Sequence, residues 1–491
     1  MEDTLFKHFG FRSFREGQKE IIESIIAEKD TIAMLPTGSG KSLCYQLPSY
    51  ILHAQVLIVS PLLSLMQDQV EQIKIRGEKK VIALNSFLSF KEKKQALKNL
   101  QHYKFIFISP EMLNLAEISE ALSSCSIRLF VVDEAHCISQ WGPDFRPDYL
   151  QLGAIKEKLG SPVTLALTAT ATVKIRADIC QSLKMASPDE WVYSVNRPNI
   201  ALKVEQLSSF QEKIHTLKQF IETLSSPGIV YFSSKKLADE LAEEMNQTTA
   251  KKISSYHAGL EQDQRILIQQ QFLTDQLDWI FATSAFGMGV NKENIRTIIH
   301  FHLPSSMEAF VQEIGRAGRD GEKSLSILLY LSKDEQITTN LLELERPSLR
   351  QISEFEKIKH TASGLKEIEE KTGLSEVQNR VLHYYAKIET NHSNWAGHVN
   401  QLILKRMVEK KRKIDQMVTY VTTDNCRRQL IVRCFDETNS IIQPFCCDQC
   451  GFPLESYIGS LGSEQRKVIT WQNRLASIFK ENENDGWTKD Y

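Results

Sequence analysis

The sequence predicts an α/β protein with two tandem parallel-sheet domains and a mainly helical C-terminal region. From about residue 20 to residue 340, short β-branched segments alternate with longer helix-forming segments. That alternation is typical of parallel sheets with helices on both faces. Beyond Arg346 the strand pattern stops, and five of the nine cysteines fall between Cys426 and Cys450. The third region is therefore expected to differ from the first two in fold and in chemistry.

Composition limits the class of protein. The chain has 491 residues, 42% of them hydrophobic, with 59 Lys and Arg against 61 Asp and Glu. This length suggests about three domains, and the composition excludes disordered and collagen-like classes. No apolar run approaches the roughly 18 residues of a membrane span, and the N-terminus lacks a signal-peptide pattern, so we expect a cytoplasmic protein without membrane contact. With a net charge of −2, any nucleic-acid binding must rest on local basic patches.

Nine apolar segments are the expected strands. Those of the first domain are Thr31–Leu35, Val56–Val59, Phe105–Ile108, Leu129–Val132 and Val163–Leu167. Those of the second domain are Gly228–Phe232, Trp279–Ala282, Thr297–Phe301 and Leu325–Leu331. The polar interval Ser194–Ser209, with its Arg-Pro pair, is the expected linker. The predicted domains are residues 1–205, 206–345 and 346–455, followed by a tail at 456–491.

A phosphate-binding loop is predicted between the first strand and the helix after it. It consists of Thr37, Gly38, Ser39, Gly40, Lys41 and Ser42. Glycines let backbone N–H groups approach phosphate oxygens, and the helix N-terminus adds a favourable dipole. Lys41 is expected to reach the β- and γ-phosphates, and Ser42 to bind Mg²⁺. The match is partial, because the full pattern has glycine where this chain has Leu35.

Two carboxylates follow the fourth predicted strand, in the run Leu129-Phe-Val-Val-Asp-Glu-Ala-His136. Ligand sites in α/β proteins lie at the C-terminal ends of strands. Asp133 is therefore expected to contact Mg²⁺ through water, and Glu134 to orient or deprotonate the attacking water. The alternative is that the two carboxylates are only the solvated start of a helix, where the helix dipole favours negative charge. The preceding phosphate loop favours an ATPase.

The second domain carries two arginines in the run Gln312-Glu-Ile-Gly-Arg-Ala-Gly-Arg-Asp320. On a helix, the spacing of Arg316 and Arg319 would place both guanidinium groups on one face. An arginine that reaches across a cleft can stabilise charge developing on a γ-phosphate. Both residues are candidates, and a surface Arg–Glu pair is the alternative role. The sequence thus predicts a catalytic site divided between two domains that closes on nucleotide.

Together these residues resemble superfamily 2 helicases, and specifically the RecQ family of DNA helicases. The resemblance is dense over residues 5–335 and looser over 405–452, and it implies two RecA-like domains. The run from Phe9 to Gln18 implies adenine recognition by Gln18, with Arg15 nearby. The runs 60–69 and 109–111 resemble motifs that touch the DNA backbone, which implies a contact at Ser60.

The resemblance also implies residues that link hydrolysis to movement, namely His136, Thr168, Thr170 and Gln312. The runs 256–260 and 282–292 are similar to motifs that contact the phosphates of the tracking strand, which implies DNA binding by His257. His302 stands where the family pattern has Asp.

The run 138–149 resembles the aromatic-rich loop of RecQ helicases, which implies that it senses single-stranded DNA and couples it to the ATPase. Trp141 and Phe145 offer flat faces for base stacking, and Arg146 offers a phosphate or cation–π contact. Gln140 is the fourth expected DNA-binding residue of this loop. Core aromatics flanking a turn are the alternative. Pro143 departs from the family, which usually has His there, and is expected to weaken or rigidify the coupling loop.

The cysteine-rich segment resembles the zinc-binding segment of the family. Cys447 and Cys450 have the C-x-x-C spacing that lets two thiolates meet one tetrahedral metal ion. Cys426 is the third ligand by motif position. The fourth is Cys446 or, as a substitute, Cys434, because the family's own position is occupied by Pro444. The zinc is expected to be structural.

Two further segments bear on nucleic-acid binding. Residues 365–387 predict two helices around a turn at Gly373, which is either a helix-turn-helix that replaces a winged helix or an ordinary helix pair. Residues 402–433 carry nine Lys and Arg against three Asp and Glu, which fits either phosphate binding or a solvated face.

We therefore expect an ATP- and Mg²⁺-dependent DNA helicase that translocates 3′→5′ on single-stranded DNA and unwinds duplex, in recombination and repair. The resemblance implies a short form, without the C-terminal winged-helix and helical accessory domains. The expected partners are ATP and single-stranded, forked or tailed DNA, with a single-stranded DNA-binding protein or another repair factor as a further candidate, and a monomer is expected. Two alternatives stay open: an RNA helicase with the same core, and an ATP-switched DNA-binding or annealing factor without processive unwinding.

Overall fold

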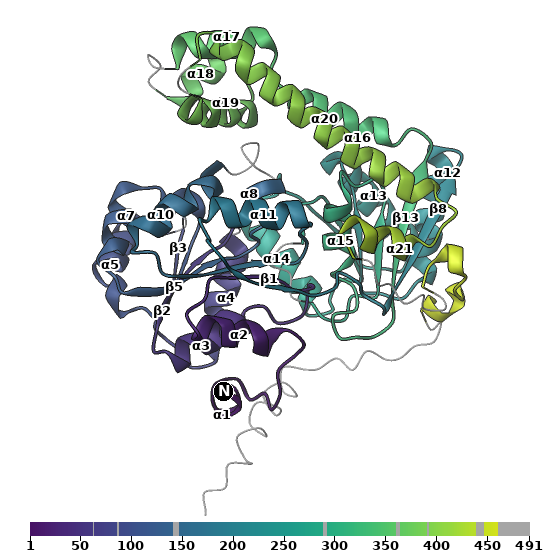
Figure 1. The fold of residues 1–491 in the computed structure, drawn as a ribbon. Helices are drawn as coiled ribbons and strands as arrows, with labels where there is room; N and C mark the ends of the chain where they lie inside the picture. The colour runs from purple at the N-terminus through teal and green to yellow at the C-terminus, as the bar shows by residue number, and fades with distance from the viewer. Residues whose placement is uncertain are drawn as a thin grey trace, which may run out of the picture.

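The computed structural model describes residues 1–61, 63–85, 88–140, 147–287, 292–359, 364–389, 392–437 and 446–459. Two α/β domains lie side by side, and the C-terminal helices extend from the second domain above the first (Figure 1). This arrangement confirms the predicted fold class.

Seven strands form the sheet of the first domain, in the order β3-β4-β2-β5-β6-β1-β7, and all their pairings are parallel. They are β1 Thr31–Met34, β2 Gln55–Val59, β3 Val81–Leu84, β4 Phe105–Ile108, β5 Ile127–Val132, β6 Val163–Thr168 and β7 Asp189–Val192. The five central strands were predicted, because strands covered on both faces are continuously apolar. The two edge strands were not predicted; in β7, half-buried residues alternate with exposed ones.

Ten helices accompany this sheet in the described part of the chain. They are α1 Glu2–Phe9, α2 Gln18–Ile26, α3 Leu43–Ile51, α4 Leu63–Ile75, α5 Phe90–Lys98, α6 Pro110–Leu113, α7 Ala116–Ser123, α8 Cys137–Gln140, α10 Leu152–Lys158 and α11 Val173–Ser182. The start of α11 is fixed by Thr172, whose hydroxyl accepts a hydrogen bond from the Ile175 N–H. This cap places the helix directly after the loop that leaves β6.

Six parallel strands form the second sheet, in the order β10-β11-β9-β12-β13-β8. They are β8 Ile200–Leu207, β9 Gly228–Tyr231, β10 Ile253–Tyr256, β11 Trp279–Ala282, β12 Thr297–His300 and β13 Ser324–Leu331. The helices are α12 Phe210–Thr223, α13 Lys235–Thr248, α14 Gln262–Leu273, α15 Met307–Ile314 and α16 Glu335–Leu344.

Strand β8 corrects the predicted linker. It pairs with β13 along its whole length at one edge of the sheet. Half of the predicted linker Ser194–Ser209 is therefore strand, and the expected boundary at residue 205 falls inside that strand. The polar positions of β8 are compatible with an edge strand, which only one neighbour covers. The connection between the sheets is residues 193–199, called the hinge segment below.

The C-terminal region is helical. It contains α17 Leu349–Ile358, α18 Leu365–Thr372, α19 Glu376–Ile388, α20 Trp395–Thr422 and α21 Arg427–Cys434, followed by two short 3₁₀ turns, Asp448–Cys450 and Leu454–Tyr457. The predicted helix pair is confirmed: α18 and α19 flank Gly373, whose left-handed φ of 65° favours glycine. These helices form a hydrophobic core of their own with the start of α20.

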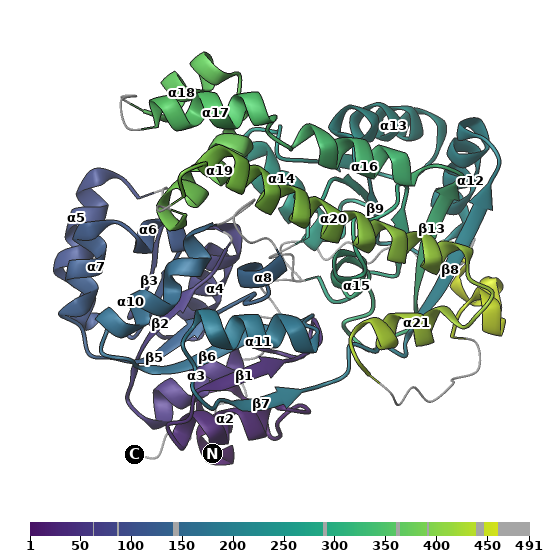
Figure 2. The ribbon, with the colours of Figure 1, turned by 45° about the horizontal axis from the view of Figure 1, so that its top comes forward.

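Helix α20 joins this small core to the main one. Figure 2 shows it running from α19 towards β8 and α21. Its last turns contribute Met417 and Tyr420 to a hydrophobic cluster shared with both α/β domains. The Tyr420 ring lies 5.0 Å from that of Phe310 on α15. No helix in the described residues has the length and apolar character needed to cross a membrane.

Candidate nucleotide cleft and cysteine cluster

The predicted phosphate loop connects β1 to α3 at the C-terminal edge of the first sheet. Gly38 and Gly40 have left-handed φ angles of 84° and 80°, which L-residues rarely adopt. Leu35 needs no such freedom, because its N–H donates to the Thr168 carbonyl (3.0 Å) and its side chain is fully buried. The missing glycine of the pattern is thus replaced by a residue that extends the sheet pairing.

Two residues predicted to recognise adenine lie against this loop. The Gln18 amide donates to the carbonyls of Ser39 (2.9 Å) and Gly40 (3.2 Å). Its oxygen accepts from the Arg15 N–H (2.9 Å), and the Arg15 guanidinium donates to the Gly38 carbonyl (2.7 Å). Both side chains therefore fix the shape of the loop, and adenine recognition stays a prediction.

The acidic pair follows β5 directly, as predicted. Burial raises the pKa of Asp133 to about 7, with the neighbouring Glu134 adding to the effect. Burial would also raise the pKa of Glu134, but Lys41 and other nearby positive charges lower it overall. Glu134 has a left-handed φ of 47°, and its N–H donates to the Asp133 carboxylate (2.9 Å). At neutral pH, Glu134 is thus the ionised member of the pair, the state a base requires.

A buried polar chain leads from Glu134 to the end of β6. The Glu134 carboxylate lies 3.4 Å from His136 Nδ1, which contacts the Thr168 hydroxyl at 3.0 Å. The Thr168 hydroxyl also donates to the Thr170 carbonyl (3.2 Å). Three of the residues predicted to couple hydrolysis to movement are therefore connected. The fourth, Gln312, lies on α15 of the second domain.

The structure corrects the expected setting of the two arginines. Helix α15 ends at Ile314, so Arg316 and Arg319 lie in the turn after it and not on a helical face. The reason is local, because Gly318 has a left-handed φ of 54° that a continuing helix cannot contain. Both guanidinium groups nevertheless lower the pKa of Glu134 from across the cleft.

The two arginines have different surroundings. Arg316 is 5% exposed and donates to the Gly287 carbonyl. The Arg319 side chain lies against the phosphate loop, with its Cγ 3.1 Å from where a Cβ on Gly38 would stand. Burial, with the charges of Arg316 and Arg197, lowers the pKa of Arg319 to about 10.

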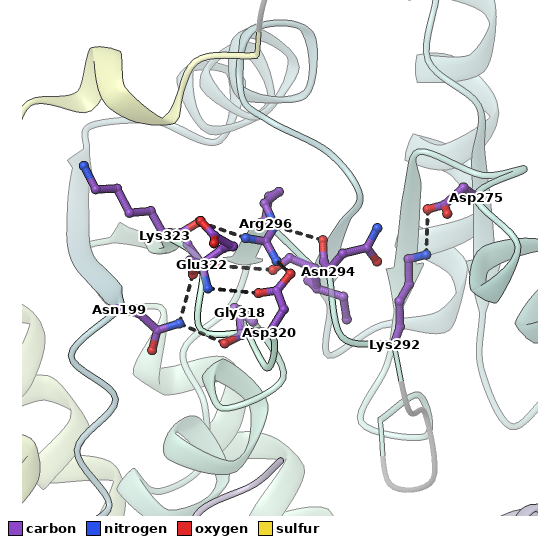
Figure 3. A network of polar contacts seen from close by, with 12 residues as sticks. Asn199, Asp275, Lys292, Asn294, Arg296, Gly318, Asp320, Glu322 and Lys323 are labelled. Carbon is purple, nitrogen blue, oxygen red and sulfur yellow. Dashed lines mark hydrogen bonds and ion pairs between the residues drawn. The ribbon is translucent and has the colours of Figure 1, made fainter. Parts of the chain in front are cut away.

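A network of polar contacts holds the turn that carries these arginines (Figure 3). Arg296 forms an ion pair with Asp320 (2.5 Å) and donates to the Lys323 carbonyl (3.2 Å). From the hinge segment, Asn199 donates to the Gly318 carbonyl (2.8 Å) and the Glu322 carbonyl (2.9 Å). The turn is thus fixed both from its own domain and from the hinge.

Arg197 of the hinge segment is a cleft residue that sequence reasoning missed. Its guanidinium donates to the Thr37 carbonyl of the first domain (3.1 Å) and to the Gly315 carbonyl of the second (3.0 Å). Beside it, the Thr37 hydroxyl also donates to the Gly315 carbonyl (2.6 Å). The only signal in the sequence was the Arg-Pro pair of the expected linker.

Charge in the cleft favours a polyanion. The charges of Lys41, Arg316 and Arg319 act on the acidic pair, Arg197 acts on Arg319, and Asp133 is partly protonated at neutral pH. The donor set also fits Mg²⁺, because Ser42 and Asp133, both beside Tyr45, supply the hard oxygens this ion prefers. Net positive charge next to glycine N–H groups suits a nucleotide triphosphate.

The residues predicted to bind DNA are only partly described. Trp141, Pro143, Phe145 and Arg146 lie outside the described residues, and Gln140 closes α8. Ser60 is 2% exposed at the end of β2. His257 is 6% exposed; its Nε2 contacts Asp239 (2.9 Å) and its Nδ1 accepts from the Gly259 N–H (3.2 Å). Because both ring nitrogens have protein partners, His257 shapes its loop, and a DNA contact through the ring would require losing one of them.

His302, where the family pattern has Asp, acts as a neutral acceptor. Burial, together with the charge of Lys213, lowers the pKa of His302 to about 3. Its Nδ1 accepts a hydrogen bond from the Ser233 N–H (3.3 Å). An acceptor is thus preserved at this position without a negative charge.

Four cysteines converge after α20. The Sγ atoms of Cys426, Cys446, Cys447 and Cys450 all lie within 4.8 Å of one another. The distances are 3.5 Å for Cys426–Cys446, 3.9 Å for Cys426–Cys447 and 3.5 Å for Cys447–Cys450. Zn–S bonds of about 2.3 Å in a tetrahedron require S–S distances of about 3.8 Å, so this set fits Zn²⁺. Cys434, the substitute ligand, is not in the group, and Pro444 lies outside the described residues.

The cysteine cluster covers the free edge of the second sheet. The Leu202 N–H of β8 donates to the Cys446 carbonyl (3.2 Å), and the Val204 N–H donates to the Asp448 carboxylate (3.0 Å). Unpaired N–H groups at a sheet edge invite association with other chains. The cluster therefore caps β8 as well as offering a metal site.

A second group of possible metal ligands forms a hydrogen-bonded cluster. Glu389, His392 and His398 lie within 4.8 Å of one another. The two imidazole rings are stacked, with centroids 3.7 Å apart and an angle of 18° between their planes. Both Nε2 atoms contact the same oxygen of Glu389 (3.0 and 3.1 Å), so hydrogen bonds to one carboxylate account for the arrangement.

The basic stretch of α20 is partly neutralised by neighbouring helices. Lys411 pairs with Glu343 (2.8 Å) on α16, and Lys413 pairs with Glu308 (2.8 Å) on α15. These contacts fix α20 to the second domain and reduce the charge available for phosphate. Phosphate binding by residues 402–433 stays a prediction.

The sequence models of three protein families match successive regions of the chain. DEAD/DEAH box helicase matches residues 15–179, helicase conserved C-terminal domain matches 212–321, and RecQ zinc-binding matches 398–451. These ranges fall on β1 to β6 of the first sheet, on β9 to β12 of the second sheet, and on almost all of α20 with α21 and the cysteine cluster.

Curated relatives and solved structures agree with these matches. The chain is 45% identical to a probable ATP-dependent DNA helicase, RecS of Bacillus subtilis, over 98% of both proteins. It is 38% identical to the ATP-dependent DNA helicase RecQ of Pasteurella multocida, over 74% of this chain and 57% of that protein. The fold resembles that of the Mycobacterium smegmatis helicase Lhr, with a TM-score of 0.57 and 19% identity over 76% of this chain and 55% of that one. On the identity to RecS along its whole length and on the RecQ zinc-binding match, the chain belongs to the RecQ helicase family.

Proposed function

We propose that this protein is an ATP-dependent DNA helicase that translocates 3′→5′ on single-stranded DNA and unwinds duplex in recombination and repair. One observation carries the proposal: the Arg319 side chain of the second domain lies against the phosphate loop of the first, among further positive charges. A site built from two domains converts binding and release of nucleotide into relative motion. The choice of DNA is supported by family membership and by the two relatives, which are described as ATP-dependent DNA helicases.

Within this proposal the cleft residues have distinct roles. Lys41 and the backbone N–H groups of the phosphate loop hold the β- and γ-phosphates. Ser42 and Asp133 hold Mg²⁺, which supplies charge neutralisation when bound. Glu134, the ionised carboxylate, orients the attacking water. Arg319 stabilises charge on the γ-phosphate, because its side chain already lies against Gly38 of the loop.

The remaining roles follow the same division. Arg15 and Gln18 contact the adenine end of the nucleotide, and the His136–Thr168 contact relays its state towards β6 and Thr170. The cysteine cluster holds a structural zinc that keeps β8 covered. We further propose that the protein acts as a monomer in the cytoplasm.

Strand displacement tests the proposal. The parent protein is expected to separate a 3′-tailed fork with ATP and Mg²⁺, and Lys41→Ala is expected to abolish this. Lys29→Ala is a matched control. Lys29 is an exposed lysine just before β1, and it pairs with Asp189 (3.4 Å) outside the cleft. No ATP-dependent displacement by the parent would refute the helicase proposal. ATPase stimulation by single-stranded RNA but not DNA would refute the choice of DNA.

A further inference from the structure

Arg197 joins the two walls of the cleft through one guanidinium group. Its Nη1 donates to carbonyls from both domains, Thr37 and Gly315, and its Nη2 donates to the carbonyls of Ala317 (3.1 Å) and Gly318 (2.6 Å). All four acceptors are neutral backbone groups of the phosphate loop or of the turn that carries the arginines. The planar fork of arginine satisfies such a set of fixed acceptors, and the single point of a lysine ammonium does not.

Arg428, on helix α21, holds the backbone of the hinge segment at Arg197. Its Nη1 donates to the Asn196 side chain (2.7 Å) and to the Arg197 carbonyl (2.9 Å). Its Nη2 donates to the carbonyls of Ile200 and Cys446. Arg428 is 5% exposed, so these contacts are shielded from water. One buried side chain thus connects the backbone of the cysteine cluster to the backbone of Arg197.

The other end of α21 contacts the first domain. The Asp436 carboxylate accepts from the N–H of Val173, the first residue of α11 (2.9 Å). The Glu437 carboxylate accepts from the Val195 N–H (2.8 Å) and from the Ser194 hydroxyl (2.5 Å). Helix α11 begins directly after the loop that contains Thr170. Helix α21 and the residues directly after it therefore contact the hinge segment and the start of α11 in the first domain.

We propose that Arg197 is a positioning residue of the nucleotide cleft and that Arg428 of α21 holds it in place, so that this one buried side chain sets how firmly the two walls of the cleft close. The inference rests on the proposed function, since it concerns closure of the same cleft. Arg197 acts on the arginine-bearing turn and on the phosphate loop, and has no direct role in the chemistry.

Hydrogen-exchange mass spectrometry on the full chain tests the connection without relying on activity. Arg428→Lys is expected to speed exchange by about fivefold or more in peptides covering residues 35–42 and 315–320, because weaker closure exposes their hydrogen bonds more often. Arg427→Lys is the matched control. Arg427 is the adjacent residue of α21, is 2% exposed, and donates to the Tyr420 carbonyl (2.6 Å) and the Asp448 carboxylate (2.5 Å) within the cysteine region.

If the inference is right, Arg428→Lys speeds exchange in the two cleft peptides, 35–42 and 315–320, and Arg427→Lys does not. Arg427→Lys is expected to change exchange only in peptides of residues 426–459 and of β8. Equal changes at both distant peptides in the two variants, or no change there in Arg428→Lys, would overturn the connection. Melting temperatures of both variants within a few degrees of the parent establish that the fold is retained.

A split between kcat and nucleotide affinity tests Arg197 itself. Arg197→Lys is expected to lower the kcat of DNA-stimulated ATP hydrolysis by about tenfold or more, the loss expected for charge-assisted hydrogen bonds that support closure. Affinity for a fluorescent ATP analogue is expected to change by less than about threefold, because the phosphate loop binds phosphates from one domain alone. A parent-like kcat in this variant would overturn the role of Arg197. A parent without any ATP hydrolysis would instead refute the proposed function, and the exchange result would still decide the connection.

Discussion

Replacing Arg319 by glutamine is expected to make the nucleotide-free protein more stable while it removes ATP hydrolysis. The pKa of Arg319 falls from its ordinary 12.5 to about 10, mainly through burial and then through Arg316 and Arg197. At 1.36 kcal/mol per pKa unit, keeping this charge in the cleft costs the folded state about 3 kcal/mol. The side chain is charged in both folded and unfolded states at neutral pH, so the penalty acts over the whole physiological range and is relieved only as pH rises through 10. The bound triphosphate would relieve it directly.

Urea unfolding at pH 7.5 without nucleotide measures the first effect. Because the lost packing of the arginine stem offsets part of the gain, we expect Arg319→Gln to raise the free energy of unfolding by about 1–2 kcal/mol. The kcat is expected to fall about 10³-fold or more, the range for arginines that stabilise a transferring phosphoryl group.

Arg316→Gln is the opposing control. Arg316 is almost fully buried and donates to the Gly287 carbonyl, so its loss leaves a buried acceptor unsatisfied and should lower the free energy of unfolding by about 1–3 kcal/mol. The reasoning would be refuted if Arg319→Gln were less stable than the parent, or if it hydrolysed ATP at near the parent rate.

Three more predictions test other parts of the molecule. Burial raises the pKa of Asp68 to about 6, so its ionisation opposes folding as pH rises through that value. Asp68→Asn should exceed the parent in unfolding free energy by about 1–2 kcal/mol at pH 8 and match it below about pH 4, and equal urea curves at pH 8 would contradict this. Cys446→Ser should lose bound zinc in a metal assay, and Cys434→Ser should keep one zinc ion per chain, because of these two cysteines only Cys446 belongs to the cluster. The reverse result would make Cys434 the fourth ligand. Lys213 is 1% exposed and pairs with Asp334, so Lys213→Met should lower the free energy of unfolding by about 3–5 kcal/mol, and adding Asp334→Asn should recover most of it. A loss in the double variant as large as in the single one would show that the pair is not the cause.

Sequence reasoning located the phosphate loop, the acidic pair and the central strands because local chemistry determines them. Glycine at positions 38 and 40 serves a left-handed backbone, and a strand buried on both faces must be apolar along its length. Strand β8 could not be distinguished from a linker, because polar residues interrupt its sequence and the residues that cover its outer edge come some 240 positions later in the chain. That cover, through the contact of Leu202 with Cys446, depends on the tertiary fold.

The arginine pair shows the same limit. Helical spacing was the wrong premise for Arg316 and Arg319, since Gly318 ends any helix between them. They still reach the cleft, because the network around Asn199 and Asp320 holds the turn. Arg197 was missed because its four acceptors come from two distant segments of chain, which no local pattern reveals.

The length of α20 has a mechanical consequence. Its 28 residues correspond to a rod of about 42 Å at 1.5 Å per residue. Lys411 and Lys413 fix the second half of this rod to α16 and α15, while the first half, about 21 Å long, carries the α17–α19 core. A rotation of the anchored half by about 10° would sweep the far end of the free half through about 4 Å, close to the spacing of about 3.4 Å between stacked bases. The helical core thus turns a small angular change at the hinge into a stroke on the scale of the substrate.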